Sequence, residues 1–159
     1  MRVSNALQVD PLIFSGKASL TPAAREDVTG GMTRSTIINL ALAATKRQIT
    51  SLGSLEQNWD TYGSTPPTRA AVAKAQQMLG TIYAEVLNAG LQWKSPHLTA
   101  SEKGEVVFEW WKDSKKLSVY LGDLDAEYIK VWGPNIATEM SDGPLTDENI
   151  AELWTWLSK

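Results

Sequence analysis

The chain has 159 residues, of which 43% are hydrophobic and 21% are charged, and its formal net charge is −3. This is the size of one globular domain, large enough to bury a core without disulfides or a structural metal. The acidic balance argues against duplex nucleic acid as a partner, because such a partner selects a basic surface. The absence of cysteine excludes disulfides, thiolate chemistry and cysteine-ligated zinc.

The N-terminal residues lack the apolar run of a signal peptide, and no segment approaches the ~18 apolar residues of a membrane span. We therefore expect a cytoplasmic protein without a membrane partner. Seven tryptophans are more than a core of this size needs. They are Trp59, Trp93, Trp110, Trp111, Trp132, Trp154 and Trp156.

Residues 1–33 show no sustained hydrophobic period and are interrupted by proline and glycine. We predict that they form a partly ordered N-terminal arm, in which only Leu12–Phe14 is apolar enough to dock onto a surface. Residues 34–159 are predicted to form a single domain.

Two amphipathic helices are predicted at the start of this domain. The first has Ser35 as its N-cap and stops at Gly53, and the second runs from about Pro67 to Ala89. Gly90 then suits the left-handed position that ends many helices. The two apolar faces consist of Ile38, Leu42, Thr45, Ile49 and Leu52, and of Val72, Ala75, Leu79, Ile82 and Val86.

Beyond Gly104 the hydrophobic period changes to two, which is typical of strands. Two strands flank the short polar turn 112–116, as a hairpin requires. Further strands are predicted at 126–133 and 135–140, and residues 96–101 are a candidate fifth strand leading into the sheet.

A short helix ends the chain, with Thr146 as its N-cap and an apolar face that includes Leu153 and Trp154. Helices and strands are thus segregated along the sequence. We predict an α+β fold in which two N-terminal helices and one C-terminal helix pack on one face of a four- or five-stranded antiparallel meander.

Alternation within the first hairpin strand predicts which side chains leave the core. Val106, Phe108 and Trp110 form the more apolar set and are expected to face the helices, so Trp111 and Tyr120 face away from them. Exposed Trp and Tyr among Lys and Glu are typical of a protein interface. The alternatives are that the arm covers this face or that a homodimer forms there.

A second candidate site is the loop EQNWDTYGSTPPT, residues 56–68, which sets two aromatic residues among turn formers. Asp60 suits an Asx-turn and Gly63 suits a positive φ. The rings of Trp59 and Tyr62 either pin the loop against the sheet or the first helix, or offer a contact to a partner. We favour the anchoring interpretation and expect Trp59 to be mostly buried.

The loop NWDTYGSTPPT, followed by a helix and by the strands GEVVFEWW, KKLSVYL and YIKVWG, resembles a group of small bacterial proteins. Members share an Asn-Trp-Asp-x-Tyr-Gly loop and a Gly-x-x-x-x-Glu-Trp strand. The resemblance covers about residues 35–158. It implies a domain that recurs in bacteria or their mobile elements, and it implies no particular reaction.

Catalytic signatures are sparse. His97 is the only histidine, and no Gly-x-Ser-x-Gly elbow or phosphate-binding loop occurs. Asp123, Asp125 and Glu127 lack the glycine and the later glutamate of a calcium loop, and we interpret them as a solvated turn. We therefore predict no catalytic residue, no metal and no cofactor.

These observations favour a non-enzymatic bacterial interaction protein of the antitoxin, immunity or anti-defence kind, which binds and occludes a protein partner. One alternative is a small hydrolase that uses Asp60 or Glu109 with His97. Another is a single-stranded nucleic-acid binder whose sheet aromatics stack on bases. The candidate binding residues are Trp59, Asp60, Tyr62, Glu109, Trp111 and Tyr120.

Overall fold

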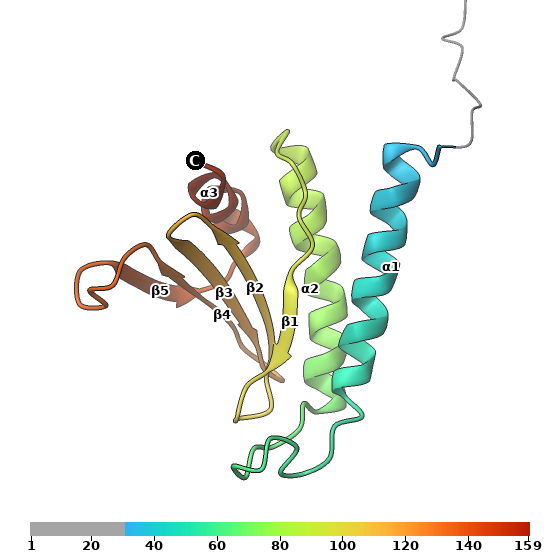
Figure 1. The fold of residues 1–159 in the computed structure, drawn as a ribbon, viewed down its shortest axis with the longest axis vertical. Helices are drawn as coiled ribbons and strands as arrows, with labels where there is room; N and C mark the ends of the chain where they lie inside the picture. The colour runs from blue at the N-terminus through green and yellow to red at the C-terminus, as the bar shows by residue number, and fades with distance from the viewer. Residues whose placement is uncertain (1–30) are drawn as a thin grey trace, which may run out of the picture. The chain divides into compact units, whose positions relative to one another are not determined.

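The computed structural model describes residues 31–159, and the predicted arm lies almost entirely outside this range. The described chain forms two helices, five strands and a final helix (Figure 1). Their bounds are α1 Arg34–Leu52, α2 Arg69–Asn88, β1 His97–Ala100, β2 Val106–Lys112, β3 Lys115–Leu121, β4 Ala126–Val131, β5 Met140–Pro144 and α3 Asp147–Ser158. The predicted α+β class with an antiparallel sheet is confirmed. None of these helices has the combined length and apolar character needed to cross a membrane.

Threonine side chains begin both long helices. The Oγ1 of Thr33 accepts a hydrogen bond from the Thr36 amide at 3.2 Å, and that of Thr68 accepts one from the Ala71 amide at 3.0 Å. These bonds satisfy amides that have no partner within the helix. The predicted cap at Ser35 was therefore wrong, since α1 already starts after Thr33.

The end of α2 confirms the predicted left-handed glycine. Gly90 has a φ of 69°, its amide donates to the Leu87 carbonyl at 2.9 Å, and the Leu91 amide donates to Val86 at 3.0 Å. This pair of bonds is a Schellman motif. It ends the helix and leads the chain towards β1, the edge of the sheet.

The five strands follow one another in the sheet in sequence order, and every neighbouring pair is antiparallel. The candidate strand at 96–101 is confirmed, because residues 97–100 form β1 and bring the number of strands to five. The bounds predicted for the last strand, 135–140, were wrong, because residues 135–139 form a turn in which the Glu139 amide donates to the Asn135 carbonyl at 2.7 Å. Pairing resumes only at Met140.

The inner face of the sheet, defined by Val106, Phe108 and Trp110, carries the core. These three side chains are at most 1% exposed, as the alternation predicted. Helices α2 and α3 pack against β2 and β3, while α1 lies along α2 and against β1 (Figure 1). Gly53, at the end of α1, allows this approach, because a Cβ there would meet Val72 Cγ2 at 3.0 Å.

An aromatic cluster lies under α3. Trp93 stacks on Trp154 with ring centroids 5.5 Å apart, and Trp154 meets Trp110 edge to face at 5.2 Å. The Nε1 of Trp110 donates to the Lys94 carbonyl at 2.8 Å, and the Nε1 of Trp154 donates to the Gln92 carbonyl at 3.1 Å. The core thus holds three of the tryptophans and fixes the segment that precedes β1.

Candidate functional site

The second face of the sheet, which we call the outer face, carries Val107, Glu109 and Trp111 of β2 together with their cross-strand neighbours. The apolar side chains of the helices join the core on the inner face instead. Val107 is only 3% exposed because Thr99 and Tyr120 stand directly beside it in the flanking strands. The middle of the outer face is therefore closed, and its exposed side chains lie towards its two ends.

Trp111 confirms the prediction that it leaves the core, since it is 43% exposed. Its ring is nevertheless held on two sides. The His97 ring lies 5.7 Å away between centroids, and the Lys116 Nζ lies 5.3 Å from the indole centroid, a cation–π distance. The outer face therefore presents an indole of defined orientation.

Glu109 organises the polar contacts beneath this indole, and its side chain is only 13% exposed. Its Oε1 lies 2.5 Å from the Lys116 Nζ and accepts a hydrogen bond from the Ser118 Oγ at 3.5 Å. Its Oε2 lies 3.5 Å from the His97 Nδ1. The carboxylate thus places both groups that flank Trp111.

The order in which Ser118, Glu109 and His97 contact one another argues against a serine hydrolase at this position. In a catalytic triad the imidazole lies between the nucleophile and the carboxylate, so that it can take the nucleophile's proton. Here Glu109 lies between Ser118 and His97, and Ser118 is 4% exposed. The Ser118 hydroxyl therefore donates to the carboxylate and not to the imidazole, which is not the order of a triad.

The other end of the outer face is acidic. Half-buried Tyr120 and Ile129 border a hollow of about 320 Å³ that Glu105 and Glu127 also line. Tyr120 pairs with Val107 in the register, two positions along β2 from Glu109. Tyr120 and Trp111 therefore belong to opposite ends of one face.

The loop of residues 56–68 is ordered around one carboxylate. Asp60 Oδ1 accepts hydrogen bonds from the amides of Tyr62 at 3.0 Å and Ser64 at 3.3 Å, and Oδ2 accepts one from the Ser64 Oγ at 2.5 Å. The Ser64 hydroxyl, with help from these amides, lowers the pKa of Asp60 below its ordinary value. The predicted Asx-turn is present, but this carboxylate does not contact His97.

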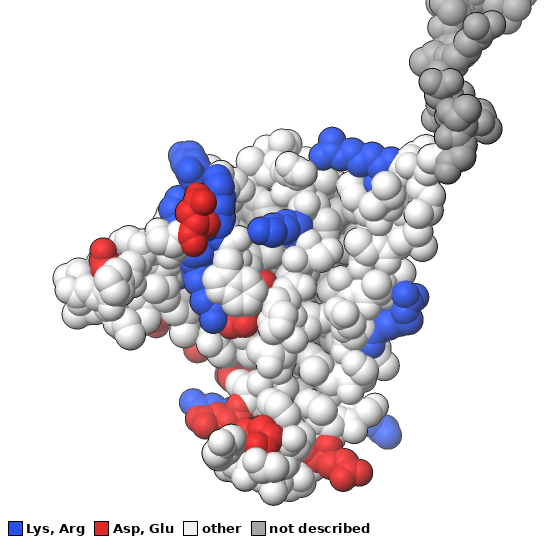
Figure 2. Space-filling model, in the orientation of Figure 1, with Lys and Arg blue, Asp and Glu red and all other residues white. Residues whose placement is uncertain are grey.

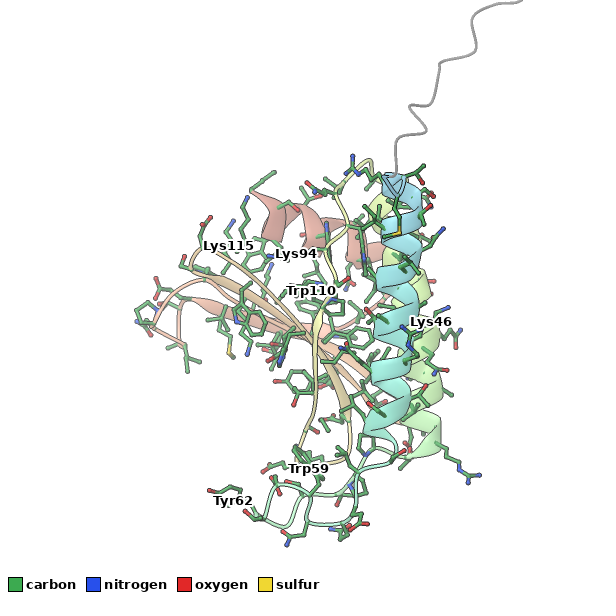
Figure 3. All side chains as sticks on the ribbon, turned by 45° about the vertical axis from the view of Figure 1, so that its right-hand side comes forward. Lys46, Trp59, Tyr62, Lys94, Trp110 and Lys115 are labelled. Atoms are coloured by element: carbon green, nitrogen blue, oxygen red, sulfur yellow. The ribbon has the colours of Figure 1, made fainter. Side chains whose placement is uncertain are left out.

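Of the two aromatic residues of this loop, only Tyr62 departs from the prediction. Tyr62 is 91% exposed, so its predicted anchoring role was wrong. Trp59 is half-buried, and its buried Nε1 has no hydrogen-bond acceptor among the described residues. Figure 3 shows the loop with both residues at one end of the molecule, away from Lys94 and Trp110.

The loop is tied to the β1–β2 turn. The Thr65 amide donates to the Glu102 carbonyl at 3.0 Å. At Gly104, where φ is 83°, an added Cβ would meet the Pro66 carbonyl oxygen at 2.9 Å. Position 104 of the β1–β2 turn therefore needs a glycine, and the sequence of the 56–68 loop gives no sign of this constraint.

The structure divides five of the six predicted binding residues into two groups, and Tyr120 lies apart from both at the acidic end of the outer face. Glu109 and Trp111 come together through Lys116, whereas Trp59, Asp60 and Tyr62 share the loop. Lys116 was missed at the sequence level, although a two-residue hairpin turn after Lys112 would have placed it opposite Trp111.

Comparison of the chain with protein families, curated proteins and solved structures finds no match. Among residues 31–159 no three histidine or acidic side chains are grouped so that they could hold a metal ion. The geometry of the outer face is therefore the main guide to function.

Proposed function

We propose that the protein is a non-enzymatic binding module that recognises a protein partner through the outer face, with Trp111 as the central contact. One observation carries this proposal. Trp111 is 43% exposed, yet His97 and Lys116 hold its ring in place. An exposed indole that serves no core is the side chain most often found to dominate the energy of protein interfaces.

The fixed orientation of the indole favours binding. A side chain that is ordered before association loses little conformational entropy when the partner arrives. The Glu109–Lys116 pair provides that order. The end of the face near Tyr120 is acidic, so the two ends of the outer face differ in charge. Charge asymmetry of this kind selects partners and their orientation more than it adds affinity.

Tyr62 is a second candidate contact, because it projects from an ordered loop and is almost fully exposed. The bacterial antitoxin, immunity or anti-defence role is one form that such binding could take, and it stays a prediction. For single-stranded nucleic acid, the sheet aromatics would need a basic surround along the whole face; lysines lie beside Trp111, but Glu127 and Glu105 border Tyr120.

The test starts with a photo-crosslinking amino acid in place of Trp111, followed by identification of the crosslinked macromolecule in cells of the source organism. The affinity of the purified partner is then measured against the intact chain, Trp111→Ala and Ile136→Ala. Ile136 is a matched control, because it is 64% exposed but belongs to the turn between β4 and β5.

We expect Trp111→Ala to raise the dissociation constant at least about 30-fold, which corresponds to a loss of about 2 kcal/mol of binding free energy. Ile136→Ala should leave the dissociation constant unchanged. Equal affinities of both variants would contradict the proposal. A crosslink to nucleic acid, with affinity that falls steeply with salt, would replace it with the nucleic-acid alternative.

A further inference from the structure

A hollow of about 450 Å³ lies at the end of the sheet where the segment before β1, the end of β2 and the last turn of α3 meet. Its volume falls within the range of small-molecule sites. The apolar lining comes from three tryptophans and two leucines. These residues are Leu91, Trp93, Trp111, Trp154 and Leu157.

Hydrogen bonds to the core fix the wall of this hollow. Gln92 and Lys94 both line it, and their carbonyls accept the indole N–H groups of Trp154 at 3.1 Å and Trp110 at 2.8 Å. Trp154 is 3% exposed and Trp110 is 1% exposed. The hollow is therefore a formed feature of the domain and does not depend on a mobile loop.

Two lysines give the hollow a positive charge. The Lys94 Nζ donates to the Trp111 carbonyl at 3.0 Å, and the Lys112 Nζ donates to the Ser158 carbonyl. An ammonium has three donors, so each lysine keeps two for other acceptors. Neither lysine pairs with a carboxylate in the part of the chain that the structure describes, and no acidic residue lines the hollow.

The surrounding surface has the same sign. A group of lysine and arginine side chains lies towards this end of the domain in Figure 2, with acidic atoms among them, while most acidic side chains on this view lie towards the opposite end. Lys115 adds to the basic end, where its Nζ donates to the Trp156 carbonyl of α3 at 2.9 Å. An anion therefore approaches a favourable potential even though the whole chain is acidic.

Trp93 supplies a further donor. It is 9% exposed and lines the hollow, and its buried Nε1–H has no acceptor among residues 31–159. Buried indole N–H groups usually find a partner. Because this N–H is itself buried, a ligand oxygen would reach it only after a shift of the Trp93 ring, and the carboxylate contacts proposed below do not depend on it.

We propose that this hollow binds an aromatic carboxylate, with the ring against the indoles of Trp93, Trp111 and Trp154 and the carboxylate at Lys94 and Lys112. Aromatic walls favour a planar apolar ligand, and paired ammonium groups favour an anion at one end of it. This site adjoins the proposed protein interface, because Trp111 belongs to both.

The probes for the test are 2-naphthoate and its neutral counterpart 2-naphthamide, added to the full chain with ¹⁵N-labelled tryptophan. Binding is followed by the shifts of the indole N–H signals in two-dimensional NMR. We expect 2-naphthoate to bind with a dissociation constant below about 1 mM and to shift the signals of Trp93, Trp111 and Trp154. The signal of Trp59, at the other end of the domain, is expected to stay in place.

Variants then assign the charge and the cavity. Lys94→Gln and Lys112→Gln are each expected to raise the dissociation constant of 2-naphthoate about tenfold. Neither should change the dissociation constant of 2-naphthamide, which binds more weakly. Lys46→Gln on α1 and Lys115→Gln are matched controls, because both change one positive charge outside the lining. Ser158→Trp places a large ring in the hollow from an exposed position and is expected to abolish binding of both probes.

Equal affinity for acid and amide would overturn the proposal, as would no binding up to several millimolar or a shift pattern led by Trp59. Thermal melts show which variants fold, and if Ser158→Trp does not, the two lysine variants decide between the outcomes. No partner protein is present in this experiment, so a negative result leaves the proposed interface untouched.

Discussion

Trp110 and Trp111 are neighbours in one strand, yet they belong to surfaces that are held together in different ways. Trp110 is 1% exposed, meets the ring of Trp154 at 5.2 Å and donates to a backbone carbonyl. Trp111 is 43% exposed and contacts a histidine ring and a lysine ammonium. One face is fixed by apolar packing and the other by charges around Glu109. A residue for stability and a residue for recognition thus lie one position apart.

The largest effect expected from this contrast is the loss of Trp110. We expect Trp110→Ala to lower the free energy of unfolding by ~3–5 kcal/mol, because it leaves a cavity in the core and removes the donor to the Lys94 carbonyl. Urea unfolding of the variant beside Trp111→Ala is the measurement. Similar midpoints for the two variants would mean that the two faces do not differ in the way described.

The inner face was predictable from the sequence because its signal is periodic. Alternation of two in β2 placed Phe108 and Trp110 correctly, and the helical spacing placed Ile49 and Leu79 in the core. In each element several apolar residues recur at the same spacing, so together they identify the face that is buried.

The outer face was less predictable because it depends on pairs from different strands. Glu109 meets Lys116 and His97 only once the register of three strands is fixed. Trp59 posed a similar problem, since its loop packs on the β1–β2 turn at Gly104, about forty residues further along the chain. Local turn chemistry predicts the shape of such a loop and not the surface that receives it.

The second prediction concerns Glu109, the polar centre of the outer face. We expect Glu109→Ala to lower the free energy of unfolding by about 1–3 kcal/mol, because the Ser118 hydroxyl, in a residue that is 4% exposed, loses its acceptor. The matched control is Glu127→Ala, an exposed glutamate on the same face, which should change stability by less than about 0.5 kcal/mol. Equal effects on urea unfolding would show that Glu109 does not organise this face.

The third prediction is a small effect on stability at Trp111. We expect Trp111→Ala to change the free energy of unfolding by about 1 kcal/mol or less, since its main contacts are a partly exposed cation–π pair and a ring edge. Fluorine NMR of fluorotryptophan-labelled protein offers a direct check, because the Trp111 signal should respond most strongly to a soluble paramagnetic agent. A loss near that of Trp110→Ala would place Trp111 in the core.

The last prediction extends the contrast to the loop, where a single carboxylate and not apolar packing sets the order. Because hydrogen bonds from Ser64 and from the Tyr62 amide hold the pKa of Asp60 below its ordinary ~3.9, the loop is stabilised above that pH. The stabilisation is lost as the pH falls through the lower pKa of the folded state. In an NMR titration the Tyr62 and Ser64 amides should therefore shift together, with a midpoint below ~3.9, while the core indole signals of Trp110 and Trp154 stay in place. Asp60→Asn should remove this transition, and its persistence in that variant would assign the acid response to another carboxylate.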